Sequence, residues 1–199
     1  DGKFTIDLGT PLTNGEQITA TATDPSDNTS LGGQVTAPDL TAPDAPANLE
    51  VSPDGKTVTG TAEPGSTVTL KDADGNTIGT GKAGNDGKFT IDLGTPLTNG
   101  EQITATATDP SGNTSPGGQV TAPDITPPAA PGNLVVAEDG ASVSGTAEPN
   151  STIIIKAPDG TIIGQATAGP DGTFTIPISP AQTNGEALEV TATDGSGNT

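Results

Sequence analysis

The chain repeats itself with a period of 85 residues. The string Asp-Gly-Lys-Phe-Thr-Ile-Asp-Leu at 1–8 returns unchanged at 86–93 and, more loosely, at 171–178. Residues 1–39 match residues 86–124 at 37 of 39 positions. A solenoid unit usually has about 20–50 residues, whereas a unit of this length is large enough to be a small domain with its own core. The period therefore predicts a string of tandem domains.

Three segments follow from this period. We interpret residues 1–39 as the C-terminal half of a repeat, 40–124 as a complete repeat with its linker, and 125–199 as a repeat that lacks its last strand. The linkers at 37–46 and 122–131 are rich in proline, which favours an extended, semi-rigid spacer. We therefore expect the repeats to be arranged as a rod.

Alternation of apolar and polar residues predicts β-strands with one buried face. Phe89, Ile91 and Leu93 alternate with Thr90 and Asp92, and no stretch shows the period of a helix. Gly and Asn mark tight turns between the strands. The seven predicted strands of the complete repeat are 48–51, 57–62, 67–71, 77–81, 88–93, 102–108 and 119–122. This pattern predicts an all-β fold of tandem immunoglobulin-like Greek-key β-sandwiches.

Composition excludes several classes of function. The chain has no His, Cys, Trp or Tyr, and its net charge is −19. It therefore has no thiolate, no imidazole base and no positive patch for nucleic acid, and no apolar run is long enough to span a membrane. Asp72 and Asp74 are a carboxylate pair of the kind that glycosidases use, but their Asp-Gly-Asn context is that of a hairpin turn. We expect no enzyme activity, no catalytic residues and no organic cofactor.

Three strings then identify a family resemblance. They are Gly-Thr-Ala-Glu-Pro-Gly-Ser-Thr-Val at 60–68, Asp-Gly-Lys-Phe-Thr-Ile at 86–91, and the run from Leu-Thr-Asn-Gly at 97–100 to Asp-Pro-Ser-Gly-Asn-Thr-Ser at 109–115. Together they resemble the bacterial Ig-like repeat of giant Gram-negative surface adhesins and biofilm-associated proteins, over the whole chain. The resemblance implies a secreted protein on the bacterial cell surface, exported by a signal outside these residues. It also implies that Ca²⁺ binds between repeats, as in some members of the family.

Topology predicts where such an ion would bind. In a seven-strand sandwich, the loops after the second, fourth and sixth strands lie at the pole where the linker enters. Ca²⁺ takes six to eight oxygen ligands, and several carboxylates at one pole without a cation are costly. The predicted ligands are Asp39, Glu63 and Asp109 at the first junction and Asp124, Glu148 and Asp194 at the second, with Asn113 and Asn198 beside them. The alternative is that these acids cap turns and keep the surface soluble.

These observations predict a stalk segment of a surface adhesin, stiffened by structural Ca²⁺ at the inter-repeat junctions. Its partners would be the neighbouring repeats of the same chain, with other adhesin chains or the biofilm matrix as further candidates, and neither nucleic acid nor membrane. The first alternative is a direct ligand-binding module, carbohydrate-binding or homophilic. The second is an accessory domain of a secreted polysaccharide enzyme.

Overall fold

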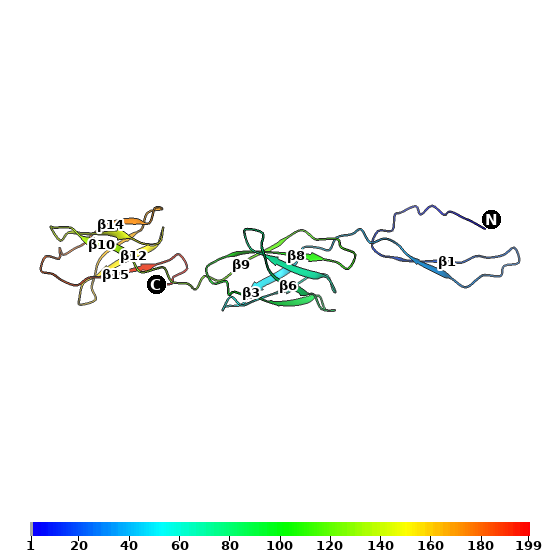
Figure 1. Ribbon diagram of the computed structural model, residues 1–199, viewed down its shortest axis with the longest axis horizontal. Helices are drawn as coiled ribbons and strands as arrows, with labels where there is room; N and C mark the ends of the chain where they lie inside the picture. The colour runs from blue at the N-terminus through cyan, green and yellow to red at the C-terminus, as the bar shows by residue number, and fades with distance from the viewer. Residues whose placement is uncertain (1) are drawn as a thin grey trace. The chain divides into compact units, whose positions relative to one another are not determined.

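The computed structural model describes residues 2–199, which form β-strands and no helix. The chain divides into two compact units, one that ends at Pro123 and a second that comprises Asp124–Thr199 (Figure 1). Because no helix is present in the described residues, none is available to cross a membrane. The all-β prediction is confirmed.

The complete repeat is a sandwich of a three-stranded and a four-stranded sheet. Its strands are β3 (Ala47–Val51), β4 (Thr57–Thr61), β5 (Thr67–Lys71), β6 (Thr77–Lys82), β7 (Lys88–Asp92), β8 (Gln102–Thr108) and β9 (Gly118–Thr121). The sheets have the orders β3-β4-β7 and β6-β5-β8-β9, all pairs antiparallel. Each strand end differs from its predicted position by at most one residue, because the alternating side chains and the turn residues mark both ends.

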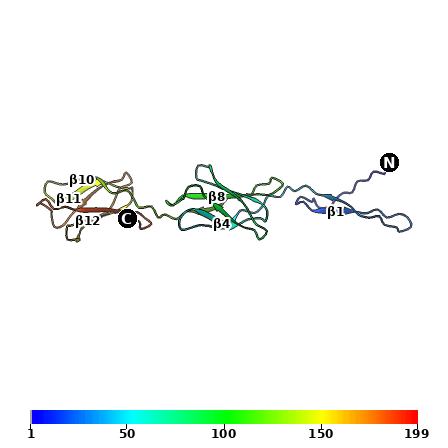
Figure 2. The same cartoon turned by 60° about the horizontal axis from the view of Figure 1, so that its bottom comes forward.

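Alternate residues of these strands form the core between the two sheets. Phe89, Ile91 and Leu93 are 4%, 3% and 8% exposed, and Ile103 and Ala105 are fully buried. Figure 2 shows β4 and β8 in separate layers, with this core between them. Beside this core the packing within one sheet is tight: a Cβ on Gly60 of β4 would lie 2.7 Å from Cζ of Phe89, its partner on β7.

The second unit repeats this architecture with six strands. They are β10 (Gly132–Val136), β11 (Ser142–Thr146), β12 (Thr152–Lys156), β13 (Ile162–Thr167), β14 (Thr173–Pro177) and β15 (Glu189–Thr193). The sheets have the orders β10-β11-β14 and β13-β12-β15, and Ile153, Ile155 and Ile176 are fully buried between them.

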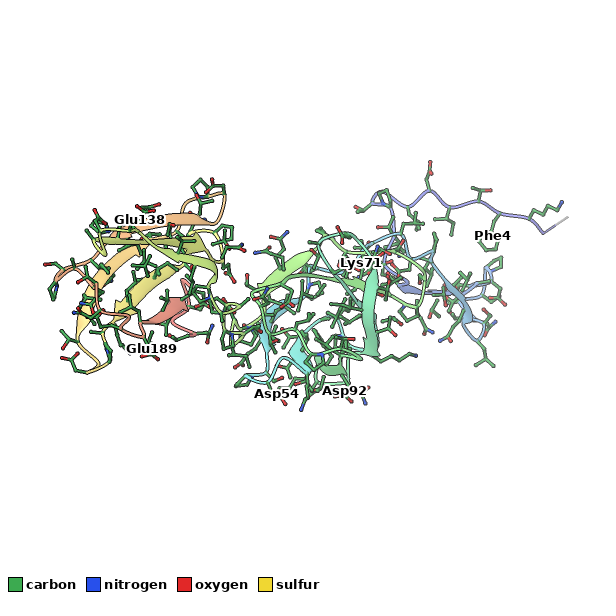
Figure 3. All side chains as sticks on the ribbon, turned by 60° about the vertical axis from the view of Figure 1, so that its left-hand side comes forward. Phe4, Asp54, Lys71, Asp92, Glu138 and Glu189 are labelled. Carbon is green, nitrogen blue, oxygen red and sulfur yellow. The ribbon has the colours of Figure 1, made fainter. Side chains whose placement is uncertain are left out.

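Residues 2–39 form only two of the three strands expected there, β1 (Gln17–Ala20) and β2 (Gly33–Thr36). Residue 1 lies outside the described residues. In the complete repeat, β7 is paired with β4, whereas the equivalent stretch at 3–7 forms no strand. Its Phe4 is 75% exposed and lies at the surface in Figure 3, whereas the equivalent Phe89 is 4% exposed.

Pairing with neighbouring strands also sets the lengths of β1, β8 and β15, which are equivalent strands of the three repeats. In β8, Gln102–Ala105 is paired with β9 and Thr104–Thr108 with β5. β1 keeps only the four residues paired with β2, and β15 keeps only the five paired with β12. Strand formation here is therefore determined by the neighbouring strand as well as by the local sequence.

Candidate functional site

The loop after β8 is closed by hydrogen bonds within the sequence Asp-Pro-Ser-Gly-Asn. The carboxylate of Asp109 accepts from the main-chain N–H of Asn113 at 2.9 Å and from its side-chain Nδ2 at 2.8 Å. The main-chain N–H of Asp109 donates to the carbonyl of Asn113 at 3.0 Å. Gly112 has a φ of 93°, a conformation that glycine adopts without strain. Five consecutive residues thus satisfy one another locally.

The loop after β15 has the same geometry. The carboxylate of Asp194 accepts from the N–H of Ser196 at 2.8 Å, the N–H of Asn198 at 2.9 Å and Asn198 Nδ2 at 2.8 Å. In the first repeat, Asp24 and Asn28 make the same loop, with Nδ2 2.9 Å from the carboxylate. The loop is therefore a property of the local sequence.

In the two larger repeats, this asparagine also binds the linker that precedes the repeat. Asn113 Nδ2 donates to the main-chain carbonyl of Asp39 at 3.2 Å, and Asn198 Nδ2 donates to that of Asp124 at 3.2 Å. A side-chain amide has two hydrogens, so one can remain on the loop carboxylate while the other reaches the linker. In the second unit, Ser196 Oγ adds a hydrogen bond of 2.7 Å to the carboxylate of Asp124.

These contacts lower the pKa of both loop carboxyls. The side-chain hydrogen bond from Asn198 lowers the pKa of Asp194 below its ordinary value, against the opposing effect of burial. Burial raises the pKa of Asp109, but the hydrogen bonds from Asn113 outweigh it and the pKa is lowered overall. Both groups are therefore anionic at neutral pH, and anionic acceptors make the stronger hydrogen bonds.

The structure brings the predicted calcium ligands together in pairs. Asp39 and Asp109 both contact Asn113, and Asp124 and Asp194 both contact Ser196 and Asn198.

The other two predicted ligands, Glu63 and Glu148, are exposed. They contribute to their loops through main-chain carbonyls, which accept from the N–H groups of Ser66 and Ser151 at 3.1 Å. Within residues 2–199 no group of three or more acidic side chains is placed to hold a metal ion. The calcium site stays a prediction.

Sequence reasoning considered Asn113 and Asn198 only as oxygen ligands and did not consider Ser196. The structure shows all three as donors to the acids. The signal that would have found this is the spacing Asp-x-x-x-Asn, which is typical of a side chain that closes its own loop.

The hollows of the described surface are open and do not form a ligand site. One of about 320 Å³ lies between Asp44, Thr61 and Glu63. A larger one of about 800 Å³ is lined by Phe4, Ile6 and neighbouring apolar residues of the first repeat. The equivalent side chains at 86–124 form the core of the second repeat, so this hollow is an uncovered core face.

Exposed acids are spread over the surface. Asp54, Asp92, Glu138 and Glu189 all point outward in Figure 3. Acids scattered in this way do not gather into one charged recognition patch.

A model of the bacterial Ig domain family matches residues 1–39, 42–124 and 127–199. This match confirms the resemblance drawn from the motifs. The family is structural and not enzymatic, which confirms the prediction that the repeats have no catalytic function. No curated protein matches the sequence.

The solved structures that match the chain include three multidomain or surface proteins at low identity. The BSP domain of a biofilm associated protein has 18% identity and a TM-score of 0.35, and the match covers 76% of this chain and 27% of that one. The central fibronectin-III array of RIM-binding protein has 16% identity and a TM-score of 0.31, with 76% and 60% covered. A two-domain fibronectin type III segment of chicken tenascin has 15% identity and a TM-score of 0.33, with 74% and 89% covered. The chain thus spans about a quarter of the length of the biofilm associated protein.

Proposed function

The chain belongs to the bacterial Ig domain family, and on that basis we propose that it is a stalk segment of a bacterial cell-surface adhesin. The observation that carries the proposal is the near-identity of consecutive repeats, 37 of 39 residues between 1–39 and 86–124. A unique recognition site needs one copy of a special surface, whereas length needs many copies of an ordinary one. The segment would project a distal binding region outside the cell and support adhesion and biofilm formation.

The geometry of the repeats supports a mechanical role. Each of the two larger repeats has its own buried core, so each can bear load as a separate domain. From the rise of a strand, each added repeat would extend the stalk by roughly 35–45 Å. No enclosed pocket in the described residues favours the alternative of a carbohydrate-binding or homophilic module.

A display experiment tests the stalk against that alternative. The chain is placed between a surface anchor and a known binding domain, in one, two or three copies, and the height of the binding domain above the cell is measured. A stalk predicts a regular increase in height with copy number. A binding module predicts instead that the soluble chain, added in excess, blocks adhesion of the native cells. Inhibition without a height increase would refute the stalk.

We also propose that Ca²⁺ stiffens the junctions. At the second junction the donor set comprises the carboxylates of Asp124 and Asp194, the hydroxyl of Ser196 and the amide oxygen of Asn198, all hard oxygen ligands of the kind that Ca²⁺ binds. At the first junction the corresponding ligands would be Asp109 and Asp39, whose carboxylate now accepts from the N–H of Thr41. Glu63 and Glu148 would have to turn inward to join. Bound Ca²⁺ would neutralise the paired charges and tie the linker to the loop. With only two carboxylates in place, water would complete the coordination and the site would be weak.

Calcium binding can be measured on the chain by calorimetry. Replacing Asp124 and Asp194 together with Ala should remove one site and leave the other. Asp54→Ala is the control, because Asp54 is an exposed acid outside the predicted ligand set and accepts a hydrogen bond from Ser52 Oγ within its own turn. Spin labels on cysteines introduced at Asp92 and Glu138 then report the junction itself, since the chain has no cysteine of its own. Calcium should narrow the distribution of distances between the labels, and identical distributions with Ca²⁺ and with chelator would exclude calcium stiffening.

A further inference from the structure

The linker that enters each larger repeat is bound by a contact that needs no metal. In both units the main-chain carbonyl of a linker aspartate accepts a hydrogen bond from the side-chain amide of an asparagine 74 residues later. The two distances are both 3.2 Å, although the units are packed independently. A contact that recurs at equivalent positions of two repeats is a feature of the repeat.

The asparagine is held ready for this contact by its own loop. One hydrogen of Asn198 Nδ2 is engaged by the carboxylate of Asp194 at 2.8 Å, and this fixes the direction of the other hydrogen. Asn198 is only half-exposed, as is Asp124, so water competes poorly for the bond. The loop therefore presents a pre-oriented donor, and little side-chain freedom is lost when the linker binds.

We propose that Asn113 and Asn198 are linker clamps, which fix the linker to the entry pole of the repeat that follows whether or not calcium is present. The proposal rests on the proposed stalk function for its biological use, since a stalk needs defined joints. The contact itself can be tested without reference to adhesion.

In the first unit the clamped residue is also held from the other side. Asp39 forms a bridge with Asn14, and the N–H of Leu40 donates to the carbonyl of Thr13 at 2.7 Å. Asp39 and Leu40 thus contact the preceding repeat, and Asp39 is also the residue that binds Asn113 of the repeat that follows. Farther along the linker, Pro43 and Pro46 are buried. The linker of this joint is therefore held at Asp39 and Leu40 and packed at Pro43 and Pro46, with exposed residues between them.

The chain contains its own control for the clamp. The loop between β5 and β6 has the sequence Asp-Ala-Asp-Gly-Asn, and Asn76 Nδ2 donates to the carboxylate of Asp72 at 3.0 Å. Its main-chain N–H also donates to that carboxylate, at 2.8 Å. This loop reproduces the local bonds of the clamp loops, but within the described part of the chain its asparagine binds no linker. Asn76→Ala and Asn198→Ala thus remove the same local interaction, and only Asn198→Ala removes a linker contact.

The test is ¹⁵N relaxation of the linker amides of Asp124, Ile125 and Thr126 in the whole chain, with chelator present. In the wild type we expect order parameters near those of rigid backbone, about 0.85, and in Asn198→Ala values below about 0.6. Asn76→Ala should leave the linker amides unchanged. Slow exchange of the core amides Ile153–Ile155 in every variant verifies that the sandwich is folded.

Three results would overturn the clamp: a linker that is mobile in the wild type without calcium, one that stays rigid in Asn198→Ala, or an equal loosening by Asn76→Ala. The first would mean that an ion is required, and the second that the hydrogen bond is dispensable. The third would mean that the loosening is not specific to loss of the linker contact. None of these results bears on whether the displayed chain raises a binding domain, so the clamp and the stalk can fail separately.

Discussion

Asn198 donates through Nδ2 to the main-chain carbonyl of Asp124 at 3.2 Å, and this bond joins the last loop of a repeat to the linker that begins it. Asn113 Nδ2 donates the same hydrogen bond to the main-chain carbonyl of Asp39. The entry pole of each larger repeat therefore contains a hydrogen-bonded network of acids and amides. In this network the loop carboxylates that were predicted to need a cation already have N–H donors.

The first prediction compares two phenylalanines in nearly identical sequences. Phe89 is 4% exposed and Phe4 is 75% exposed, although 37 of 39 residues around them agree. Phe89→Ala should reduce the free energy of unfolding of the complete repeat by about 3–5 kcal/mol, the usual result of emptying a core. Phe4→Ala should change the free energy of unfolding of residues 2–39 by less than about 0.5 kcal/mol, as expected at an exposed site. Urea unfolding measures both, followed at the amides of β8 for Phe89→Ala and at the amides of β1 for Phe4→Ala.

Equal effects of the two substitutions would mean that residues 2–39 are packed in solution as tightly as 86–124. Thr5→Ala on the same segment serves as a surface control, because Thr5 is exposed as well.

The second prediction concerns Gly60 of β4, which is packed against side chains of the neighbouring strands β3 and β7. A Cβ here would lie 2.7 Å from Phe89 Cζ and 2.8 Å from Leu49 Cδ2. Gly60→Ala should therefore destabilise the repeat by about 1–3 kcal/mol, because the packed aromatic ring has to move. Gly94→Ala is the matched control, since a Cβ at Gly94 meets no described atom within 4 Å. In calorimetry Gly60→Ala should lower the melting temperature by several degrees, and Gly94→Ala should not.

Most of the sandwich could be predicted from the sequence, because the features that define a strand are local. Phe89, Ile91 and Leu93 alternate with polar residues, and the predicted burial is the observed burial. The stretch 3–7 has the same local sequence but forms no strand, because β7 owes its pairing to β4. Pairing depends on residues distant in sequence, and an alternation pattern contains no information about them.

The site was less predictable. Topology placed Asp109 and Asp194 at the entry pole, with the linker aspartates beside them. Topology could not give the directions of the side chains. These depend on whether the carboxylates bind N–H groups of their own loop or an ion shared with residues distant in sequence. The loop bonds of Asn113 and Asn198 form within five residues, so no chain entropy of long-range closure opposes them. Glu63 and Glu148 are not followed by such an asparagine and extend into solvent.

The third prediction is a loss of linker order in acid. The hydrogen bonds from Asn198 hold the pKa of Asp194 below its ordinary value. A carboxyl with a lowered folded-state pKa stabilises the fold above its unfolded pKa, about 3.9, and this contribution disappears as the pH falls through the folded value. Between neutral pH and about pH 5 the linker should therefore be unaffected. As the pH falls through the lowered folded-state pKa of Asp194, the amides of 124–126 should become mobile.

Asp194→Asn is the test of this mechanism, since it removes the titrating group and keeps the side-chain size. Carbon NMR of the wild type gives the pH range in which Asp194 titrates. Over that range the linker order parameters of Asp194→Asn should not change. Titration of Asp194 at or above the pKa of an unstructured aspartate would contradict the proposed hydrogen bonding.

The fourth prediction tests the linker clamp and the calcium site with one substitution, which removes the amide donor of Asn198 and adds a carboxylate ligand in its place. Asn198 now bridges Asp124 and Asp194 by donating to the main-chain carbonyl of the first and the carboxylate of the second. In Asn198→Asp the donor is lost and a third carboxylate is added, so without metal the linker should be repelled and mobile. Ca²⁺ sites gain affinity with the number of charged ligands, so the same variant should bind calcium more tightly than the wild type. Added calcium should then restore rigidity at 124–126.

Gln165→Asp adds the same charge at an exposed position of β13 and should change neither property. Calorimetry and ¹⁵N relaxation, each with Ca²⁺ and with chelator, measure the two effects on one sample. If Asn198→Asp binds no more calcium than Gln165→Asp, then the two acids are not close enough to share an ion, and the hydrogen-bonded clamp alone orders the linker.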